Sequence, residues 1–263
     1  MKAIILAAGQ GTRLKKYTKD LPKGMLIFMG KTVIERQIDI YRRAGIFDII
    51  IVKGFAGDKI NYKGVKYYTN EEYSTTNMVE SLLKAKEEFD DDIVISYSDI
   101  LFDKTMLEEL MKNENDYVVA VDDNWKEYWF QRYGKVDFDT ESLKIDENDN
   151  IISIGKEAPV LKEVDSRYIG LLKFSLKGMK KIIEIHDRDY EEYLDKPWKQ
   201  SGKTIRNAYM TDLLHAISES GEKVKAQRFN NGWIEFDTNE DYEKACEWSE
   251  NGIINKFLND ELD

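Results

Sequence analysis

A run of apolar residues near the start of the chain ends abruptly in a glycine-containing turn. The stretch KAIILAAGQGTRL begins at Lys2, and its apolar part is long enough for a buried strand but too short for a membrane span. Gly9 and Gly11 follow, and a glycine backbone can turn tightly or approach a ligand because it has no Cβ. Free N–H groups of such a turn can bind phosphate oxygens, and Arg13 adds a positive charge. The sequence therefore predicts a strand followed by an anion-binding loop.

Two common phosphate-binding loops do not match this stretch. A Walker loop needs Gly, four residues and then Gly-Lys-Ser or Gly-Lys-Thr, a pattern that the stretch lacks. A dinucleotide-binding loop needs a third glycine where this chain has Leu14, and an acidic residue where the second strand ends in Lys53. A lysine cluster follows instead, with Pro22 directly before Lys23. In a chain with a net charge of −11, this cluster favours a polyanion site over the alternative, a solvated basic loop.

Strand-like and helix-like segments alternate through the first half of the chain. Residues 32–45 have apolar side chains at helical spacing, and Thr32 and Glu35 are placed to form a capping box. The β-branched run 48–54 is typical of a strand in a doubly covered parallel sheet. A strand, a helix and a buried strand follow at 64–70, 76–89 and 91–99. This alternation predicts an α/β fold with a mostly parallel sheet.

The second half of the chain has short strands separated by polar turns. We expect such strands at 117–125, 133–138, 143–146 and 150–155. Helices follow near 176–186 and 205–218, and strands return over 223–237. Thr238 and Asp241 have the spacing of a capping box for a last helix. Because no Pro/Gly-rich linker interrupts the chain, we predict one domain over 1–263, composed of 1–122, 123–242 and a helical tail at 243–263.

Composition excludes several classes of protein. The net charge of −11 argues against nucleic acid as a partner, because a phosphate backbone needs a basic surface. Cys246 is the single cysteine, which excludes a disulfide framework and a cysteine zinc site. No signal peptide precedes MKAIIL and no apolar stretch reaches bilayer length. We therefore expect a soluble cytoplasmic protein that does not bind a membrane.

Several motifs resemble one family of enzymes. LAAGQGTRL followed by PKGM resembles the signature of sugar-phosphate and related nucleotidylyltransferases. The later motifs resemble those of its CTP-dependent group, the phosphocholine, phosphonate and phosphoglutamine cytidylyltransferases, of which the phosphonate enzymes are most similar. These motifs run in order to about Tyr242, and they are YTNEEYSTTNMVESL, ISYSDILF, NWKEYWFQRY, IGKE, YIGLLKF, YMTDLL and GWIEFDT. The resemblance implies a Rossmann-like nucleotidyltransferase fold, with a mixed, mostly parallel central sheet and a smaller β-rich part that binds the acceptor.

The resemblance also implies a reaction. A phosphate or phosphonate oxygen of the acceptor would attack the α-phosphorus of CTP and release pyrophosphate. Such a nucleophile is already anionic, so the protein must mainly align two anions and neutralise charge. The implied cofactor is Mg²⁺, which prefers one or two carboxylates plus phosphate oxygens and water. Asp99 and Asp237 each follow an apolar strand, and the resemblance assigns the metal to them; a turn residue and a helix-cap neighbour are the alternative roles.

Other roles follow from the same resemblance. Arg13 would bind the β- and γ-phosphates, and Lys23 would bridge the α-phosphate and the acceptor. Asn77 would bind cytosine or ribose, cap its helix, or do both. Gly24 stands where relatives often carry a side chain, and we expect it to loosen Lys23. The predicted catalytic residues are Arg13, Lys23, Asp99 and Asp237, and the predicted nucleotide-binding residues are Leu6, Ala7, Ala8, Gly9, Gly11, Thr12, Arg13 and Asn77.

The half of the chain over 123–242 is expected to bind the acceptor. Arg132 and Lys156 would supply cations for a phosphate or phosphonate, whereas the aromatic residues of this half are equally expected in the core. The predicted acceptor-binding residues are Trp125, Trp129, Arg132, Lys156, Tyr168, Trp233 and Glu235.

The expected acceptor is a small phosphonate, such as 2-hydroxyethylphosphonate or 2-aminoethylphosphonate. Phosphocholine and L-glutamine phosphate are alternative acceptors. An alternative function is that of a hexose-1-phosphate nucleotidylyltransferase that uses UTP or dTTP. An alternative of another class is a non-catalytic module that senses nucleotides. A homodimer is left open.

Overall fold

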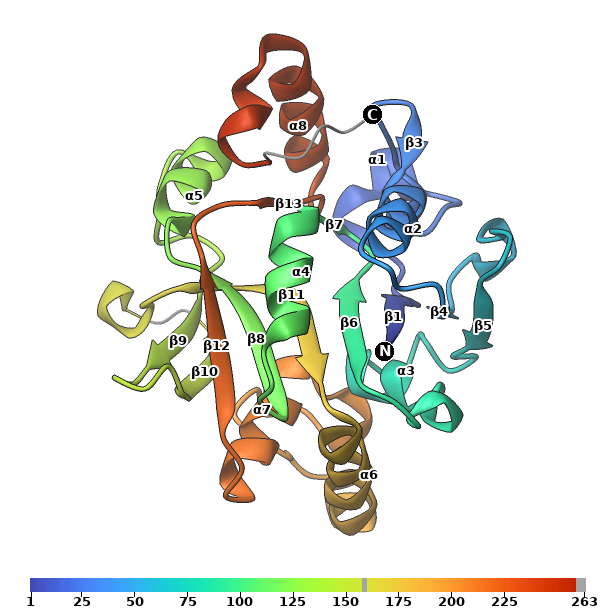
Figure 1. The fold of residues 1–263 in the computed structure, drawn as a ribbon, viewed down its shortest axis with the longest axis vertical. Helices are drawn as coiled ribbons and strands as arrows, with labels where there is room; N and C mark the ends of the chain where they lie inside the picture. The colour runs from blue at the N-terminus through green and yellow to red at the C-terminus, as the bar shows by residue number, and fades with distance from the viewer. Residues whose placement is uncertain (158–159, 259–263) are drawn as a thin grey trace.

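The computed structural model describes residues 1–157 and 160–258. Within them, seven strands form a central sheet in the order β12-β8-β11-β6-β1-β4-β5 (Figure 1). Strands β1 (Lys2–Ala7), β4 (Ile49–Lys53), β5 (Lys66–Thr69) and β6 (Ile93–Tyr97) pair in parallel. Strands β1, β4 and β6 are the buried runs of the first half, whereas β5 is a partly exposed edge strand, and all four follow the predicted alternation of strand and helix.

The second half of the chain completes the same sheet. Strand β11 (Arg167–Phe174) runs antiparallel to both β6 and β8 (Tyr117–Asp122). Strand β12 (Val224–Phe229) pairs in parallel with β8 at the edge of the sheet. The α/β class and the mixed, mostly parallel sheet are therefore confirmed. The functional division of the chain at residue 122 remains a prediction, and residues 259–263 of the predicted tail lie outside the described residues.

Helices cover both faces of the sheet because alternate strand residues point to opposite faces. In β1, Ala3 and Ile5 belong to one apolar cluster, while Ile4 and Leu6 belong to the other. The first cluster includes residues of α2 (Val33–Arg43), α4 (Lys104–Lys112), α5 (Trp125–Tyr133) and α8 (Asn239–Asn251). The second includes residues of α3 (Met78–Leu83), α6 (Leu176–Asp189) and α7 (Met210–Glu219).

Smaller elements lie around this sheet. Short antiparallel pairs join β2 (Ile27–Phe28) to β3 (Lys31–Thr32), β7 (Ile100–Phe102) to β13 (Trp233–Glu235), and β9 (Glu141–Ile145) to β10 (Ile151–Glu157). A one-turn helix, α1, spans Lys15–Thr18. The 3₁₀ helices are Thr12–Leu14, Lys23–Met25, Gly57–Lys59, Lys86–Glu88, Leu161–Glu163, Glu191–Tyr193, Ile205–Asn207 and Ile253–Lys256.

The predicted helix ends are partly confirmed. Thr32 caps α2, since its Oγ1 accepts a hydrogen bond from Glu35 N at 3.1 Å. Thr238 and Asp241 form the predicted capping box of α8. The helices expected over 76–89 and 205–218 are each divided into an α-helix and a separate 3₁₀ turn.

The strand predicted over 133–138 is wrong. Tyr133 is the last residue of α5, which ends at Gly134 in the left-handed conformation. The apolar residues of this stretch pack on the helix instead of entering a sheet. The ring of Tyr133 contacts that of Trp129 with centroids 5.7 Å apart, and Phe138 contacts Tyr133 at 5.0 Å.

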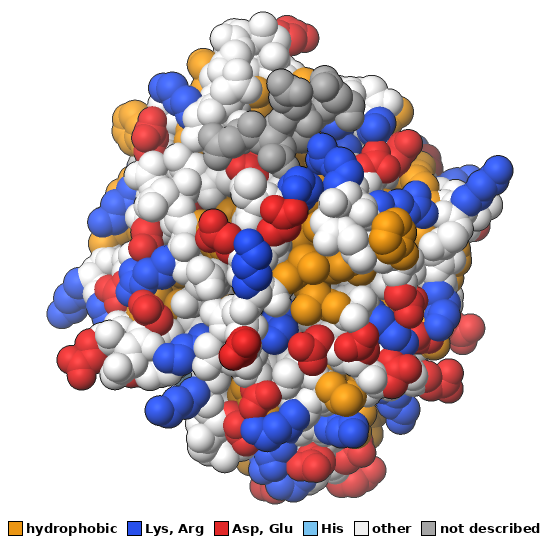
Figure 2. Space-filling model, in the orientation of Figure 1, with side chains coloured by type: hydrophobic (Ala, Val, Ile, Leu, Met, Phe, Trp, Pro, Cys, Tyr) orange, Lys and Arg blue, Asp and Glu red, His pale blue; other side chains and the backbone are white. Residues whose placement is uncertain are grey.

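The surface carries charges of both signs. On the face drawn in Figure 2, lysine and arginine side chains are interspersed with aspartate and glutamate. In the part of the chain that the structure describes, no helix has the length and apolar character needed to cross a membrane.

Candidate active site

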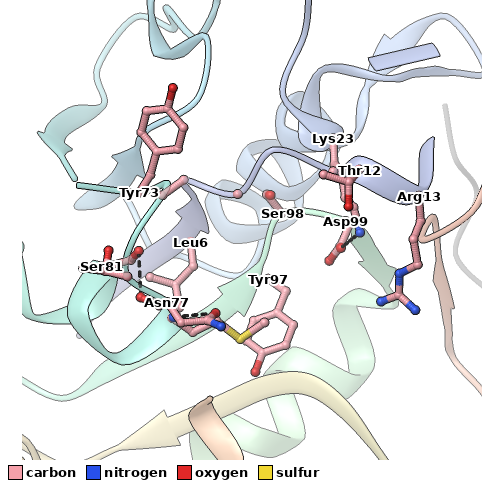
Figure 3. A pocket seen from close by; sticks show the side chains of 15 residues that line it. Leu6, Thr12, Arg13, Lys23, Tyr73, Asn77, Ser81, Tyr97, Ser98 and Asp99 are labelled. Carbon is pink, nitrogen blue, oxygen red and sulfur yellow. Dashed lines mark hydrogen bonds and ion pairs between the residues drawn. The ribbon is translucent and has the colours of Figure 1, made fainter. Parts of the chain in front are cut away.

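Two adjoining cavities open near the carboxyl ends of β1 and β6, the place where parallel α/β sheets usually bind ligands. The first cavity, of about 370 Å³, is formed by the opening loop, the start of α3 and the turn after β6. Its lining is Leu6, Ala8, Gly9, Gly11, Thr12, Arg13, Lys23, Tyr73, Thr76, Asn77, Met78, Ser81, Tyr97, Ser98 and Asp99. Figure 3 shows Tyr73, Asn77 and Ser81 at one end, and Arg13, Lys23 and Asp99 at the other.

The second cavity, of about 600 Å³, lies against strands of the second half. It shares five lining residues with the first cavity, which are Arg13, Lys23, Met78, Tyr97 and Asp99. Its remaining lining is Asp137, Asp139, Thr140, Glu141, Glu157, Arg167, Tyr168, Ile169, Gly170, Tyr209, Thr211, Trp233, Glu235 and Asp237. A ligand in one cavity can therefore meet a ligand in the other beside the shared charged residues.

All four predicted catalytic side chains meet at this junction. Lys23 Nζ donates to Asp99 Oδ2 at 3.0 Å and also to Asp237 Oδ1. Arg13 Nη2 lies 2.7 Å from Asp237 Oδ2, and its Nη1 donates to Asp139 Oδ2 at 3.2 Å. Asp237 is buried, whereas Arg13 is more than half exposed. Cations and carboxylates therefore alternate in one ion-pair network, and this network links the opening loop to both predicted metal ligands.

The carboxylates of this ion-pair network stabilise the charged forms of Lys23 and Arg13. Burial lowers the pKa of Lys23, but Asp99 and Asp237 outweigh that effect, so the pKa lies above its ordinary value. Burial likewise lowers the pKa of Arg13, and Asp237 and Asp139 raise it beyond its usual range. Both side chains are therefore cations at neutral pH, as phosphate binding requires.

The local sequence explains how Lys23 reaches this position. Pro22 is buried with φ of −63°, and it precedes the 3₁₀ turn that starts at Lys23. Gly11 has φ of +62°, and a Cβ there would lie 2.5 Å from Lys23 Cγ. The opening loop thus packs directly on the Lys23 side chain.

The expectation that Gly24 loosens Lys23 stays a prediction, but the structure shows that this glycine is closely packed. A Cβ on Gly24 would lie 2.5 Å from Ile34 Cγ1 and 2.9 Å from the carbonyl oxygen of Ser98. Gly24 is buried, and it allows this turn to pack closely on α2 and on the segment that follows β6. The absence of a side chain at position 24 therefore allows the turn that begins at Lys23 to pack against Ile34 and Ser98 without a clash.

Asp99 and Asp237 form a donor set that fits Mg²⁺. Each follows a strand by two residues, since β6 ends at Tyr97 and β13 ends at Glu235. The two segments are joined by a hydrogen bond from Phe236 N to the Asp99 carbonyl oxygen at 2.8 Å. One cation, the Lys23 ammonium, already contacts both carboxylates. Two carboxylates in the lining of one cavity match the usual protein ligands of Mg²⁺.

The structure brings most of the predicted nucleotide-binding residues to the first cavity. Leu6, Ala8, Gly9, Gly11, Thr12, Arg13 and Asn77 line it, whereas Ala7 is buried in the core and does not. Asn77 also caps α3, because its Oδ1 accepts from Met78 N at 2.9 Å. Sequence reasoning did not single out Tyr73, Thr76, Ser81, Tyr97 and Ser98, although all five lie in the YTNEEYSTTNMVESL and ISYSDILF motifs.

Three of the predicted acceptor-binding residues line the second cavity. Tyr168 donates from its hydroxyl to Tyr97 Oη at 2.9 Å, which ties strand β11 to β6 at the cavity wall. Trp233 Nε1 donates to Asp122 Oδ2 at 3.0 Å, so its indole is fixed. Glu235 lies between the junction and α5.

Four predicted acceptor-binding residues do not line either cavity. Trp125 and Trp129 belong to α5 and are fully buried in the core, with ring centroids 6.0 Å apart. Lys156 is exposed, and its Nζ lies 3.4 Å from Glu163 Oε1. Arg132 is buried and forms ion pairs inside the protein. The two tryptophans therefore have the second of the roles expected for them, which is packing in the core.

Arg132 instead holds two acidic residues in place. Its Nε and Nη2 bind the Asp241 carboxylate at 2.9 and 2.7 Å, and its Nη1 binds Glu235 Oε2 at 2.7 Å. Asp241 in turn accepts from Thr238 N at 2.9 Å. The segment from Glu235 to Thr238, which carries Asp237, is therefore held at both ends by one guanidinium.

The second cavity is mainly acidic. Its described lining carries the carboxylates of Asp99, Asp137, Asp139, Glu141, Glu157, Glu235 and Asp237, against the cations of Arg13, Lys23 and Arg167. Burial raises the pKa of Glu141, and the charge of Arg167 opposes that rise. Sequence reasoning did not single out the acidic residues over 137–157. Asp137, Asp139 and Glu141 lie outside the recognised motifs, whereas Glu157 ends the IGKE motif.

The amino-acid sequence matches a known family model. Residues 3–152, more than half of the chain, match the model described as a MobA-like NTP transferase domain. A CTP:phosphoglutamine cytidylyltransferase of Campylobacter jejuni is 34% identical over 94% of this chain and 100% of the relative. A choline-phosphate cytidylyltransferase of Streptococcus pneumoniae is 34% identical over 63% of this chain and 74% of the relative.

Solved structures share the fold. A CTP:phosphocholine cytidylyltransferase from Streptococcus pneumoniae superposes with a TM-score of 0.68 at 24% identity, covering 94% of this chain and 97% of the other. An inositol-1-phosphate CTP transferase from T. maritima has a TM-score of 0.68 at 21% identity, over 95% and 96% of the two chains. At these identities, the likeness concerns the fold alone.

Proposed function

This chain belongs to the MobA-like NTP transferase family and is a nucleotidyltransferase, and on that premise we propose that it transfers CMP from CTP to a small acceptor. The reacting group of the acceptor is a phosphate or a phosphonate. The products are a CDP-type or CMP-phosphonate compound and pyrophosphate.

One observation carries this proposal, which is the junction of two cavities at Arg13, Lys23 and Asp99. A nucleotidyl transfer needs two anionic substrates whose phosphorus and oxygen meet at one cationic point. Here the first cavity extends from the junction to Tyr73 and Asn77, which is the arrangement expected for a nucleoside triphosphate. The second cavity supplies a separate approach for the acceptor.

The choice of CTP rests on relatives. The relative that matches over its full length uses CTP by its description, as does the choline-phosphate relative. A relative described as a UTP–glucose-1-phosphate uridylyltransferase is 27% identical over 44% of this chain. These relations favour CTP over UTP for the first cavity.

The transfer is a direct displacement. An acceptor oxygen forms a bond to the α-phosphorus, and the bond from that phosphorus to the bridging oxygen breaks. The bonding electron pair leaves with pyrophosphate, so no oxidant is needed. No general base is needed either, because the attacking phosphate or phosphonate oxygen is already anionic. Lys23 would bind the transferred α-phosphoryl group, while Arg13 would bind the departing phosphates.

Binding of substrate requires an exchange of ion pairs. Lys23 and Arg13 now contact carboxylates, and phosphate oxygens would replace those contacts in part. Asp99 and Asp237 would then hold a magnesium ion, which neutralises charge on the triphosphate when it is bound. Asp139, released by Arg13, would remain in the wall of the second cavity.

The charge of the second cavity favours an acceptor with an ammonium group. Carboxylates outnumber cations in its described lining, and they would repel an acceptor that carries only negative charge. Among the acceptors expected from the sequence, 2-aminoethylphosphonate fits this lining better than 2-hydroxyethylphosphonate. Phosphocholine and phosphoglutamine, the acceptors in the descriptions of relatives, also carry a cationic nitrogen.

The test is pyrophosphate release with each nucleotide and each acceptor. The enzyme is incubated with Mg²⁺ and CTP, UTP, dTTP or ATP, together with one of the acceptors above or glucose 1-phosphate. We expect release with CTP and an amine-bearing acceptor. Release with UTP or dTTP and glucose 1-phosphate contradicts the proposal and favours the hexose-phosphate alternative. Nucleotide binding in a calorimeter without release in any mixture favours the sensing module.

A further inference from the structure

We propose that Arg167 binds a carboxylate group of the acceptor, so that the acceptor is an amino acid bearing a phosphate or phosphonate. This inference rests on the proposed function and adds the chemical class of the acceptor. It also assigns a residue that selects that class.

Arg167 is held rigidly in the wall of the second cavity. It is the first residue of β11, where its backbone pairs with Asp122 of β8. Its guanidinium lies over the ring of Trp129, with Cζ 4.2 Å from the ring centroid. The indole Nε1 of Trp129 donates to the Phe138 carbonyl oxygen at 2.8 Å, which fixes the ring. A stacked guanidinium keeps its edge free to form two parallel hydrogen bonds with a carboxylate.

The Arg167 guanidinium stacks on Trp129 but has no hydrogen-bond or ion-pair partner among the residues that the structure describes. Its Nε is buried without a hydrogen bond, and no described carboxylate lies within ion-pair distance of the guanidinium. By contrast, Arg13 and Lys23 of the same cavity each contact two carboxylates. Burial of a hydrogen-bond donor without a partner is costly, so a ligand group that accepts from Arg167 is strongly favoured.

Arg167 does not bind the reacting phosphate or phosphonate group of the acceptor. That group must reach the α-phosphorus at the junction, beside Lys23, Arg13 and Asp99, which line both cavities. Arg167 lines only the second cavity. It is therefore placed to bind a second anionic group on the part of the acceptor that extends away from the junction.

The carboxylates around Arg167 are placed to bind the ammonium group of an amino acid. Glu141 is close enough to Arg167 for the two charges to interact, but they form no ion pair. An α-amino acid presents an ammonium and a carboxylate on one carbon, so it can contact both side chains at once. Phosphocholine and 2-aminoethylphosphonate offer the cation alone and would leave the Arg167 donors without a partner.

The experiment compares acceptors that differ by one carboxylate. O-phosphoserine is paired with phosphoethanolamine, and 2-amino-4-phosphonobutyrate is paired with 3-aminopropylphosphonate. Phosphocholine and 2-aminoethylphosphonate complete the panel, at fixed CTP and Mg²⁺. We expect kcat/KM to favour the carboxylated member of each pair by at least about tenfold, because a site built for a hydrogen-bonding group rejects an analogue without it.

The variant Arg167→Gln isolates the residue. It should lower kcat/KM for the carboxylated member of each pair by at least about tenfold more than for the member without a carboxylate, so that the preference disappears. Arg167→Lys keeps the charge but loses the two-bond geometry, and it should recover part of the preference. Lys181→Gln, which removes a cation from the α6 surface, is the control and should change neither value. Thermal unfolding and CTP binding of each variant report whether the fold and the first cavity are intact.

Each remaining outcome has one meaning. Equal kcat/KM within both pairs for the wild-type enzyme overturns this inference and leaves the proposed function intact. An equal loss for both members of a pair in Arg167→Gln shows that Arg167 binds the reacting group, which also overturns it. Absence of pyrophosphate with every acceptor in the panel contradicts the proposed function itself.

Discussion

The Lys23 ammonium lies 3.0 Å from Oδ2 of Asp99, and the same nitrogen contacts Asp237. One lysine therefore links the ends of β6 and β13, which are far apart in the sequence. Its charge neutralises two carboxylates now and would neutralise phosphate oxygens when substrate binds.

Lys23→Ala should lower the rate of the chemical step more than it weakens CTP binding. The lysine charge matters most where negative charge develops on the transferred phosphoryl group. Arg13→Ala should instead weaken CTP binding as well, because it removes contacts with the departing phosphates. Single-turnover rates and calorimetric CTP titrations separate the two effects. A Lys23→Ala enzyme with weaker CTP binding and normal turnover would refute this division of roles.

Asp99→Asn and Asp237→Asn should each lower turnover on the order of a hundredfold or more, since each removes a carboxylate of the proposed magnesium site. Wild-type activity should disappear with EDTA and return with excess Mg²⁺. Asp58→Asn, at an exposed position in a 3₁₀ turn away from both cavities, is the matched control and should be active. Near-normal turnover in either folded site variant contradicts the assignment of two carboxylates to the metal.

Arg132→Met should destabilise the protein by about 3–5 kcal/mol, because it leaves the buried Asp241 and the neighbouring Glu235 without their cation. Arg132→Lys should retain part of that stability but lower kcat, since one ammonium cannot reproduce the two-bond contact with Asp241. Urea unfolding gives the free energy, and steady-state kinetics give kcat. Unchanged stability in Arg132→Met would show that the guanidinium does not hold this segment.

Gly24→Ala should lower stability by about 1–3 kcal/mol, the usual range for overpacking a core position. The added Cβ would meet Ile34 and the Ser98 carbonyl oxygen, so turnover should also fall as Lys23 is displaced. Adding Ile34→Val to this variant should restore only a small part of the loss, because it removes Cδ1, which would lie 2.6 Å from the new Cβ, and keeps Cγ1, which would lie 2.5 Å from it. A Gly24→Ala enzyme that matches the wild type in unfolding and turnover would contradict the tight packing described here.

Glu88 should make stability depend on pH below neutrality. Burial raises the pKa of Glu88, but hydrogen bonds from Lys2, Lys66 and Tyr68 outweigh it and lower the pKa to about 2. Because the folded pKa lies below the unfolded one, the stabilisation is complete above the unfolded pKa of about 4.3 and is lost as pH falls towards 2. Glu88→Gln should therefore be less stable than wild type at pH 7, and the difference should shrink at pH 3. Urea unfolding at both pH values tests this, and a constant difference contradicts it.

Local features of the sequence predicted much of the first half and the core of the site. The buried runs of β1, β4 and β6 and the apolar spacing of α2 are periodic within a few residues, so they can be recognised without tertiary information. The glycine loop, Lys23 and the two strand-end aspartates were recognisable because their motifs are short and contiguous. The structure brings these residues together at one edge of the sheet.

The acceptor side depended on contacts that no local pattern encodes. The sequence identified Arg132 as a cation for the acceptor, but its partner Asp241 lies 109 residues away and holds it inside the protein. Trp129 was expected to contact the acceptor, yet packing of α5 buries it beneath Arg167. Arg167 itself was not singled out, because an arginine at the start of a strand carries no signal of what it faces.

Sequence alone determined the α/β class, the strand and glycine turn at the start of the chain, and the residue types at the junction, because periodicity and short motifs reside within single segments. Only the tertiary structure decided which cations can bind a ligand and which are neutralised by carboxylates of the protein. It also decided that the lining of the second cavity is acidic. Those properties depend on distances between side chains from separate strands and helices, which are fixed when the two halves of the chain complete one sheet.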